Sequence, residues 1–176
     1  GEDEANVALA LRILGDFQGV VIGFSKFEEG LMVAPGNPLK IRSVQDLARR
    51  DVRLVNRESG AALRSLLEDC LARERIPMEA VGGFEDLVAS HSEGAQRVLY
   101  GTADAALGLR AVASVYGLDF IGISTVRCDL VIPQDLMEHP AVRVLLDVLQ
   151  SRAFREELNH LPGYDTSETG KVIVRR

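Results

Sequence analysis

The alternation of strand and helix patterns along this 176-residue chain predicts an α/β fold, with a mostly parallel sheet and helices on both of its faces. Two further observations support this prediction. Apolar residues recur at helical spacing between short apolar runs, most clearly from Leu63 to Leu71. Strings of glycine and proline, such as the one over residues 35–38, separate the segments.

Hydrophobic periodicity gives the expected elements in chain order. A helix over residues 7–14 comes first, and Gly15 is its stop signal. Ser43 is the expected N-cap of a short helix, and Pro77 ends the helix that contains Leu63 and Leu71. The other helices are expected over 90–100, 111–116, 142–149 and 153–161, and the strands over 19–24, 31–34, 52–55, 81–84, 103–107, 120–123, 130–132 and 172–174.

Composition and charge exclude some classes of protein. The chain is 47% hydrophobic and 26% charged, which is typical of a globular domain. Its formal charge of −6 argues against a broad nucleic-acid surface but is compatible with a local cationic pocket. No apolar run is long enough to span a bilayer, and no basic-then-apolar leader opens the chain. Cys70 and Cys128 fit neither a disulfide framework nor a metal motif, and as buried free thiols they favour a cytoplasmic protein, with a periplasmic location as the alternative.

The segment that follows the strand at 52–55 is the best candidate for a binding site. In open parallel sheets, ligands bind beyond the carboxyl ends of the strands, where the next helices begin. Three consecutive small residues leave the first-turn amides accessible, and the helix dipole favours an anion there. A serine before them would cap the helix or donate its hydroxyl to the ligand, and two flanking arginines would supply positive charge. The expected ligand-binding residues of this turn are Arg57, Ser59, Gly60, Ala61, Ala62 and Arg64.

A second helix start, Ser90-His91-Ser92, is expected to face the same ligand, and Gly108 ends a strand that would reach the same cleft. Each feature also has a simpler interpretation. The small residues after residue 58 would then form only a tight turn with Ser59 as the N-cap, and His91 would be a capping or surface residue.

Known catalytic and cofactor motifs are absent from the sequence. It contains no P-loop, no Gly-x-Gly-x-x-Gly fingerprint and no His-x-x-x-His spacing. No Ser-His-Asp arrangement and no pair of carboxylates at catalytic spacing is visible. We therefore expect a binding domain rather than an enzyme, with no metal site and no cofactor.

Several motifs in a fixed order resemble a known family. They read GLMVAPGNP at 30–38, DLA at 46–48, RLVNR at 53–57, ADAALG at 103–108, GLDF at 117–120, DLVIP at 129–133 and LPGYD at 161–165. In this order they resemble the type II periplasmic-binding-protein-like domain of molybdate-related proteins, which is commonly fused to a helix-turn-helix or a molybdopterin-biosynthesis domain. One departure lies in the anion turn, where Leu63 stands in place of the family's usual threonine.

The resemblance implies a domain organisation. Residues 1–37 would form part of lobe one and the crossing strand, residues 38–125 lobe two, and residues 126–176 the return to lobe one. The chain begins with Gly rather than Met and starts late relative to the family domain, so we expect a piece of a longer protein with an incomplete first lobe.

The function implied by the resemblance is the binding or sensing of an oxyanion, with molybdate or tungstate first, in a molybdenum-related regulator or biosynthesis protein. One alternative is an inducer-binding domain for an organic molecule such as an amino acid or a pterin. Others are a solute-binding component of an ABC transporter, an enzyme, and a scaffold that only dimerises. The expected partners are the small anion, a DNA-binding or molybdopterin domain outside this chain, and a second copy in a homodimer.

Overall fold

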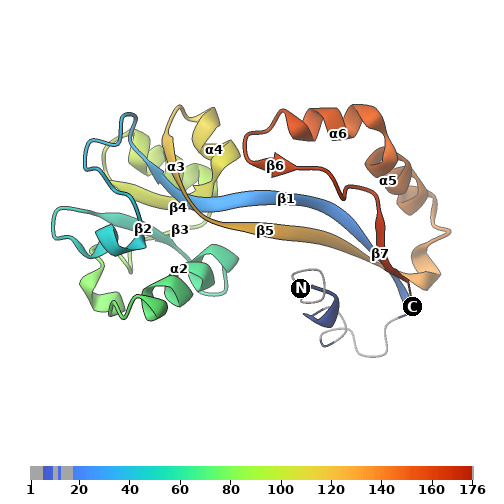
Figure 1. Cartoon of the computed structure of the whole chain (residues 1–176), viewed down its shortest axis with the longest axis horizontal. Helices are drawn as coiled ribbons and strands as arrows, with labels where there is room; N and C mark the ends of the chain where they lie inside the picture. The colour runs from blue at the N-terminus through green and yellow to red at the C-terminus, as the bar shows by residue number, and fades with distance from the viewer. Residues whose placement is uncertain (1–5, 10–11, 13–17, 176) are drawn as a thin grey trace. The chain divides into compact units, whose positions relative to one another are not determined.

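The computed structural model describes residues 6–9, 12 and 18–175 (Figure 1). By its internal contacts the chain divides into two units, Gly1–Phe27 with Val126–Arg176, and Glu28–Thr125. The second unit contains the candidate site. Half of the helix expected over 7–14, namely residues 10, 11, 13 and 14, lies outside the described residues. No helix within the described ranges is long and apolar enough to cross a membrane.

Two long strands carry the chain from one unit to the other. β1 (Gly19–Val33) and β5 (Asp119–Pro133) each have 15 residues. The sequence predicted two short strands in place of each, because polar residues interrupt the apolar runs. That prediction was wrong, because cross-strand pairing continues through the polar stretch. β6 (Tyr164–Asp165), for example, pairs with β1 at Lys26 and Phe27.

The sheet of the second unit has the order β3-β2-β4-β1-β5. β2 (Leu54–Arg57) is parallel both to β3 (Leu87–Val88) and to β4 (Ala105–Leu109). β1 is antiparallel to β4 over residues 29–33. The expected α/β class is confirmed, but the sheet is mixed rather than mostly parallel, because β1 pairs antiparallel with β4 and β6.

Helices cover both faces of this sheet, as Figure 1 shows. The helix α2 (Ala62–Arg73) and the 3-10 helix η1 (Val44–Ala48) pack on one face, where they share a core cluster with alternate residues of the strands. α3 (His91–Leu99) and α4 (Arg110–Val115) contribute to a second cluster on the other face. The period-2 pattern of a strand explains the division, because successive side chains point to opposite faces.

The prediction of a strand over residues 81–84 was wrong. The structure has the 3-10 helix η2 (Met78–Ala80) and then a turn, and β3 begins later. Gly83 has a φ of +85°, and a Cβ at this position would lie 2.0 Å from the Leu54 carbonyl oxygen. The turn therefore runs against the backbone of β2, with the Leu54 amide donating to the Gly82 carbonyl at 2.8 Å.

The first unit contains its own apolar cluster. α5 (Pro140–Gln150) and α6 (Arg152–Asn159) meet at Ser151, whose hydroxyl accepts a hydrogen bond from the Phe154 amide at 3.2 Å and so caps α6. The 3-10 helix η3 (Gln134–Leu136) precedes them. The last strand, β7 (Val172–Arg175), pairs antiparallel with β1.

Candidate functional site

The carboxyl ends of three parallel strands meet at one edge of the sheet. Arg57 at the end of β2 is paired with Val88 at the end of β3. Leu109 ends β4, and Glu29 of the antiparallel β1 lies opposite it. α2 and α3 begin just beyond the ends of β2 and β3, so their N-termini lie at this same edge. This is the place where ligands bind in open α/β sheets.

A hollow of about 450 Å³ lies at this edge. Its volume falls within the usual range for small-molecule sites. All its lining residues belong to the second unit. They come from β1, from the end of β2, from the turn that leads into α2, and from the start of α3: Glu29, Arg57, Glu58, Ser59, Gly60, Ala61, Ala62, Leu63 and His91.

The turn into α2 presents unpaired backbone donors to the hollow. Within the described part of the chain, no residue accepts a hydrogen bond from the amides of Ser59, Gly60, Ala62 or Leu63. Gly60 has a φ of +90°, which favours glycine, and no atom lies within 4 Å of the place where its Cβ would be. The space above the turn is therefore open, and these amides together with the helix dipole can stabilise an anion there.

The N-cap of α2 is Ala61, which makes no side-chain capping bond. The alternative in which Ser59 acts as an ordinary N-cap therefore does not describe this helix. Ser59 is exposed and lines the hollow. Its hydroxyl is thus available to a ligand.

Arg57 is the cation of the hollow. Its guanidinium donates to both carboxylate oxygens of Glu58, at 3.2 and 2.9 Å, and to the Ala89 carbonyl at 3.1 Å. The arginine side chain is only 12% exposed, so these bonds hold it in place. The ion pair also lowers the pKa of Glu58 through the hydrogen bonds from Arg57. A ligand would therefore meet a positioned guanidinium whose charge Glu58 partly compensates.

His91 supplies a neutral ring rather than a second positive charge. Its Nδ1 lies 3.5 Å from an Arg57 nitrogen. Burial lowers the pKa of His91 below its usual value, and the adjacent Arg57 charge lowers it further, against the opposing effect of Glu58. Near neutral pH the imidazole can thus donate or accept one hydrogen bond at the wall of the hollow.

Four of the residues predicted from the sequence lie elsewhere. Arg64 donates to Glu68 at 2.9 Å and stacks over the Phe84 ring at 5.0 Å, away from the lining of the hollow. The Ser90 hydroxyl is occupied as the N-cap of α3, where it accepts from the Glu93 amide at 3.1 Å.

Ser92 is exposed and does not line the hollow. Gly108 is buried, and a Cβ there would lie 2.5 Å from the end of the Met32 side chain. Its small size therefore serves the packing of β4 against β1.

The sequence reasoning missed Glu29. This residue is 7% exposed and lines the hollow from β1. The only signal in the sequence was a glutamate placed directly before the apolar run Gly30–Val33. That signal does not distinguish a strand end in solvent from a carboxylate at the floor of a site.

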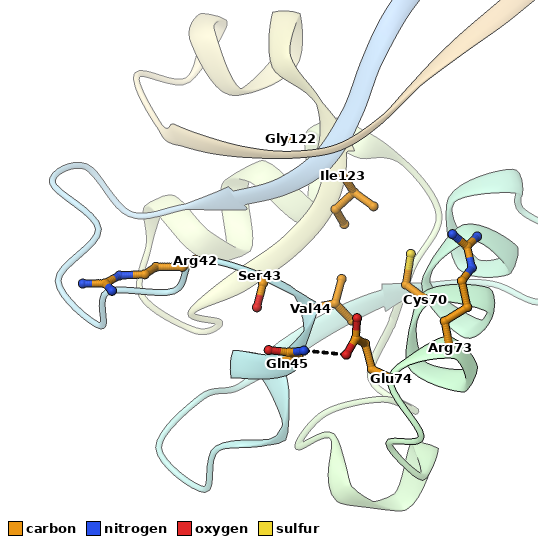
Figure 2. A pocket seen from close by; sticks show the side chains of 9 residues that line it. All are labelled: Arg42, Ser43, Val44, Gln45, Cys70, Arg73, Glu74, Gly122 and Ile123. Carbon is orange, nitrogen blue, oxygen red and sulfur yellow. Dashed lines mark hydrogen bonds between the residues drawn. The ribbon is translucent and has the colours of Figure 1, made fainter.

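A second hollow, of about 250 Å³, lies between η1, the C-terminal half of α2 and β5 (Figure 2). Its acidic side chain, Glu74, accepts a hydrogen bond from Gln45 at 2.5 Å. Figure 2 shows Arg42 extending away from the other lining side chains. Val44 and Ile123 supply apolar surface. Because Glu74 is paired and Arg42 extends away, this hollow is a weaker candidate than the one at α2.

No group of three His, Cys, Asp or Glu side chains within the described residues is placed to hold a metal ion.

A family model agrees with this architecture. The model of the PBP superfamily domain matches residues 1–150. The chain belongs to the PBP superfamily. Its fold is thus that of a ligand-binding domain, and the edge described above is the place to look for its ligand.

A curated relative resembles this PBP domain over most of its length. The uncharacterized protein YvgK of Bacillus subtilis is 33% identical over 169 residues, which cover 96% of this chain and 54% of the relative. This chain therefore spans about half of that relative's length.

Two solved structures share the fold. L-phospholactate-bound PEB3 has a TM-score of 0.61 at 19% identity, covering 92% of this chain and 75% of that one. A molybdenum ABC transporter substrate-binding domain from Clostridium difficile has a TM-score of 0.57 at 13% identity, covering 94% and 73%.

Proposed function

We propose that this PBP domain binds a small ligand through an anionic group at the N-terminus of α2. The observation that carries the proposal is the set of unpaired amides at residues 59, 60, 62 and 63, which line the same hollow as Arg57. Donors of this kind need no rearrangement to receive an anion. The absence of any side chain over Gly60 leaves the approach to them open.

The strength of such a site follows from the donors. A hydrogen bond to a charged group contributes about 1.5–3 kcal/mol net. Three or four bonds of this kind, less the cost of immobilising the ligand, correspond to affinities in the micromolar range. We therefore expect binding that a thermal-shift or calorimetric titration detects.

The first ligand candidates are molybdate and tungstate, sensed within a molybdenum-related regulator or biosynthesis protein. Support comes from the ordered motifs that resemble molybdate-related proteins and from the shared fold of the Clostridium molybdenum-transporter domain. Fusion to a DNA-binding or molybdopterin domain, a role in transport and a homodimer stay predictions.

An organic ligand is the second candidate, and the volume of the hollow favours it. The hollow measures about 450 Å³ and is lined by residues of β1, β2, α2 and α3. A tetrahedral oxyanion has only five heavy atoms and would fill a small part of that space. A carboxylate or phosphate attached to an organic body would use the same amides and fill more of the hollow.

A thermal-shift titration tests the proposal. Molybdate, tungstate, sulfate and phosphate are titrated in parallel with small carboxylic acids at constant ionic strength. A ligand at one hundred times its Kd stabilises the folded protein by about 2.7 kcal/mol, which raises Tm by about 5–10 °C in a chain of this size. A flat response to every anion would refute the proposal.

The variant Ala61→Asp tests the location of the site. It places a carboxylate at the turn, and we expect any anion response to disappear. Aspartate is a favourable N-cap residue, so the helix itself should not lose stability. The matched control is Ala141→Asp, an exposed position in the first turn of α5 that lies outside the hollow. An anion response that survives in Ala61→Asp would place the site elsewhere.

A further inference from the structure

Glu29 is a largely buried residue whose carboxylate has no partner among the residues that the structure describes. It is 7% exposed, and none of the residues that the structure describes forms a hydrogen bond or an ion pair with its side chain. It lines the hollow that also holds the turn into α2. Its carboxylate meets solvent only through the hollow, and partial loss of hydration makes its negative charge less favourable unless a cation compensates it.

Its neighbour on β1 shows that this arrangement is specific to Glu29. Successive residues of a strand face opposite sides of the sheet. Glu28 is paired with Arg110, whose guanidinium lies 4.8 Å from the centre of the Phe120 ring. Glu29 lies on the side of Leu31 and Val33, which belong to the cluster packed against α2. One glutamate is thus satisfied within the protein, and the other faces a cavity.

The charges around the hollow do not neutralise Glu29. Arg57 is already bound to Glu58 through two hydrogen bonds, and His91 is held neutral by burial and by Arg57. Burial raises the pKa of Glu29, and no hydrogen bond from a cation offsets this effect among the described residues. The hollow thus has donors at the turn into α2 and an acceptor on β1.

A fully deprotonated inorganic oxyanion fits one of these two groups and not the other. It would bind the amides, but it would place further negative charge in the same hollow as Glu29. A molecule that carries an anionic group and an ammonium group satisfies both. The volume of 450 Å³ leaves room for such a molecule.

We propose that the ligand of this domain is a small zwitterion of the amino-acid type, whose anionic group binds the turn into α2 and whose ammonium group donates to Glu29. This inference rests on the proposed function, because it assumes that the anionic group binds at that turn. It makes Glu29 the residue that determines specificity. On this inference a zwitterion ranks ahead of the molybdate and tungstate considered above, because the same contact selects against oxyanions and simple carboxylic acids.

The test is a titration of the protein with the twenty L-amino acids and phosphoethanolamine, by thermal shift and then by calorimetry. For each compound that binds, two analogues are compared, one with a hydroxyl in place of the ammonium group and one without the anionic group. We expect at least one zwitterion to bind and each analogue to bind at least about tenfold more weakly, as the loss of a hydrogen bond to a charged group implies.

Two variants connect the result to the residue. Glu29→Gln keeps the shape of the side chain and removes its charge, so the Kd for the zwitterion should rise at least about tenfold. Glu28→Gln makes the same change one position earlier, on the other face of β1, and should leave the Kd unchanged. The Tm of each free variant verifies that it is folded.

The outcomes separate this inference from the proposed function. If oxyanions or plain carboxylates bind and Ala61→Asp abolishes their binding, the proposed anion site is supported. If, in the same experiment, none of the zwitterions binds, the proposed role of Glu29 is refuted. A zwitterion that binds equally well to Glu29→Gln also overturns it. If no anion and no zwitterion binds, both proposals fail.

Discussion

The side chain of Asn56 should contribute strongly to stability, because it connects two backbone segments beneath the site. Asn56 is fully buried at the end of β2. Its amide nitrogen donates to the Phe84 carbonyl at 3.0 Å, and its oxygen accepts from the Arg57 amide at 2.8 Å. The residue thereby holds the turn before β3 against the strand that leads into the candidate anion site.

The variant Asn56→Ala removes both bonds and leaves a buried carbonyl and a backbone amide without these partners. A buried polar group that loses its partner costs about 1–3 kcal/mol, so the pair corresponds to about 2–6 kcal/mol of unfolding free energy. In urea denaturation followed by circular dichroism, the midpoint should fall by about 0.7 M or more, given a slope of about 1–3 kcal/mol/M.

The control for this variant is Ser90→Ala. It removes one side-chain bond to the backbone at an exposed helix N-terminus, where water can replace the hydroxyl. Loss of such a cap costs about 1 kcal/mol. If Asn56→Ala destabilised the protein no more than Ser90→Ala, the reasoning that burial makes these bonds costly to lose would be refuted.

Two other predictions concern backbone geometry and pH. Gly83→Ala should destabilise the protein far more than Gly101→Ala in thermal unfolding, since a Cβ at Gly83 meets the Leu54 carbonyl at 2.0 Å and one at Gly101 meets nothing within 4 Å, although both have a positive φ. The hydrogen bond from Arg53 lowers the pKa of Asp104 in the folded protein. The ionised Asp104 therefore stabilises the fold fully above its pKa in the unfolded chain, about 3.9, and this stabilisation is lost as the pH falls through the lower pKa of the folded protein. Asp104→Asn should therefore be less stable than the wild type at pH 7, and the gap should narrow below about pH 3.9; a gap that is constant across a pH series of urea titrations would contradict this.

Elements whose pattern is local were predicted well from the sequence. The helix at 63–71 lies within α2, and the helix expected over 90–100 corresponds to α3 at 91–99. Short-range spacing is enough in these cases, because one face of each helix is apolar. The prediction of an accessible amide turn after β2 also used only local features, namely small residues at a helix start, and those residues do line a hollow.

Elements whose pattern depends on partners distant in sequence were not predicted well. β1 is continuous because β6 pairs with its polar stretch. The segment near Gly83 is a turn because the backbone of β2 lies against it. The position of Arg64 outside the hollow depends on the same kind of contact, since its guanidinium lies over the Phe84 ring and donates to Glu68.

The sequence by itself determined the α/β class and the position of a turn rich in free amides, because periodicity and residue size are properties of neighbouring residues. Only the tertiary structure decided that Glu29 is buried and faces that turn. The exposure of a side chain depends on which segments pack around it, and Glu29 owes its surroundings to α2 and to the ends of β2 and β4, which are distant in sequence.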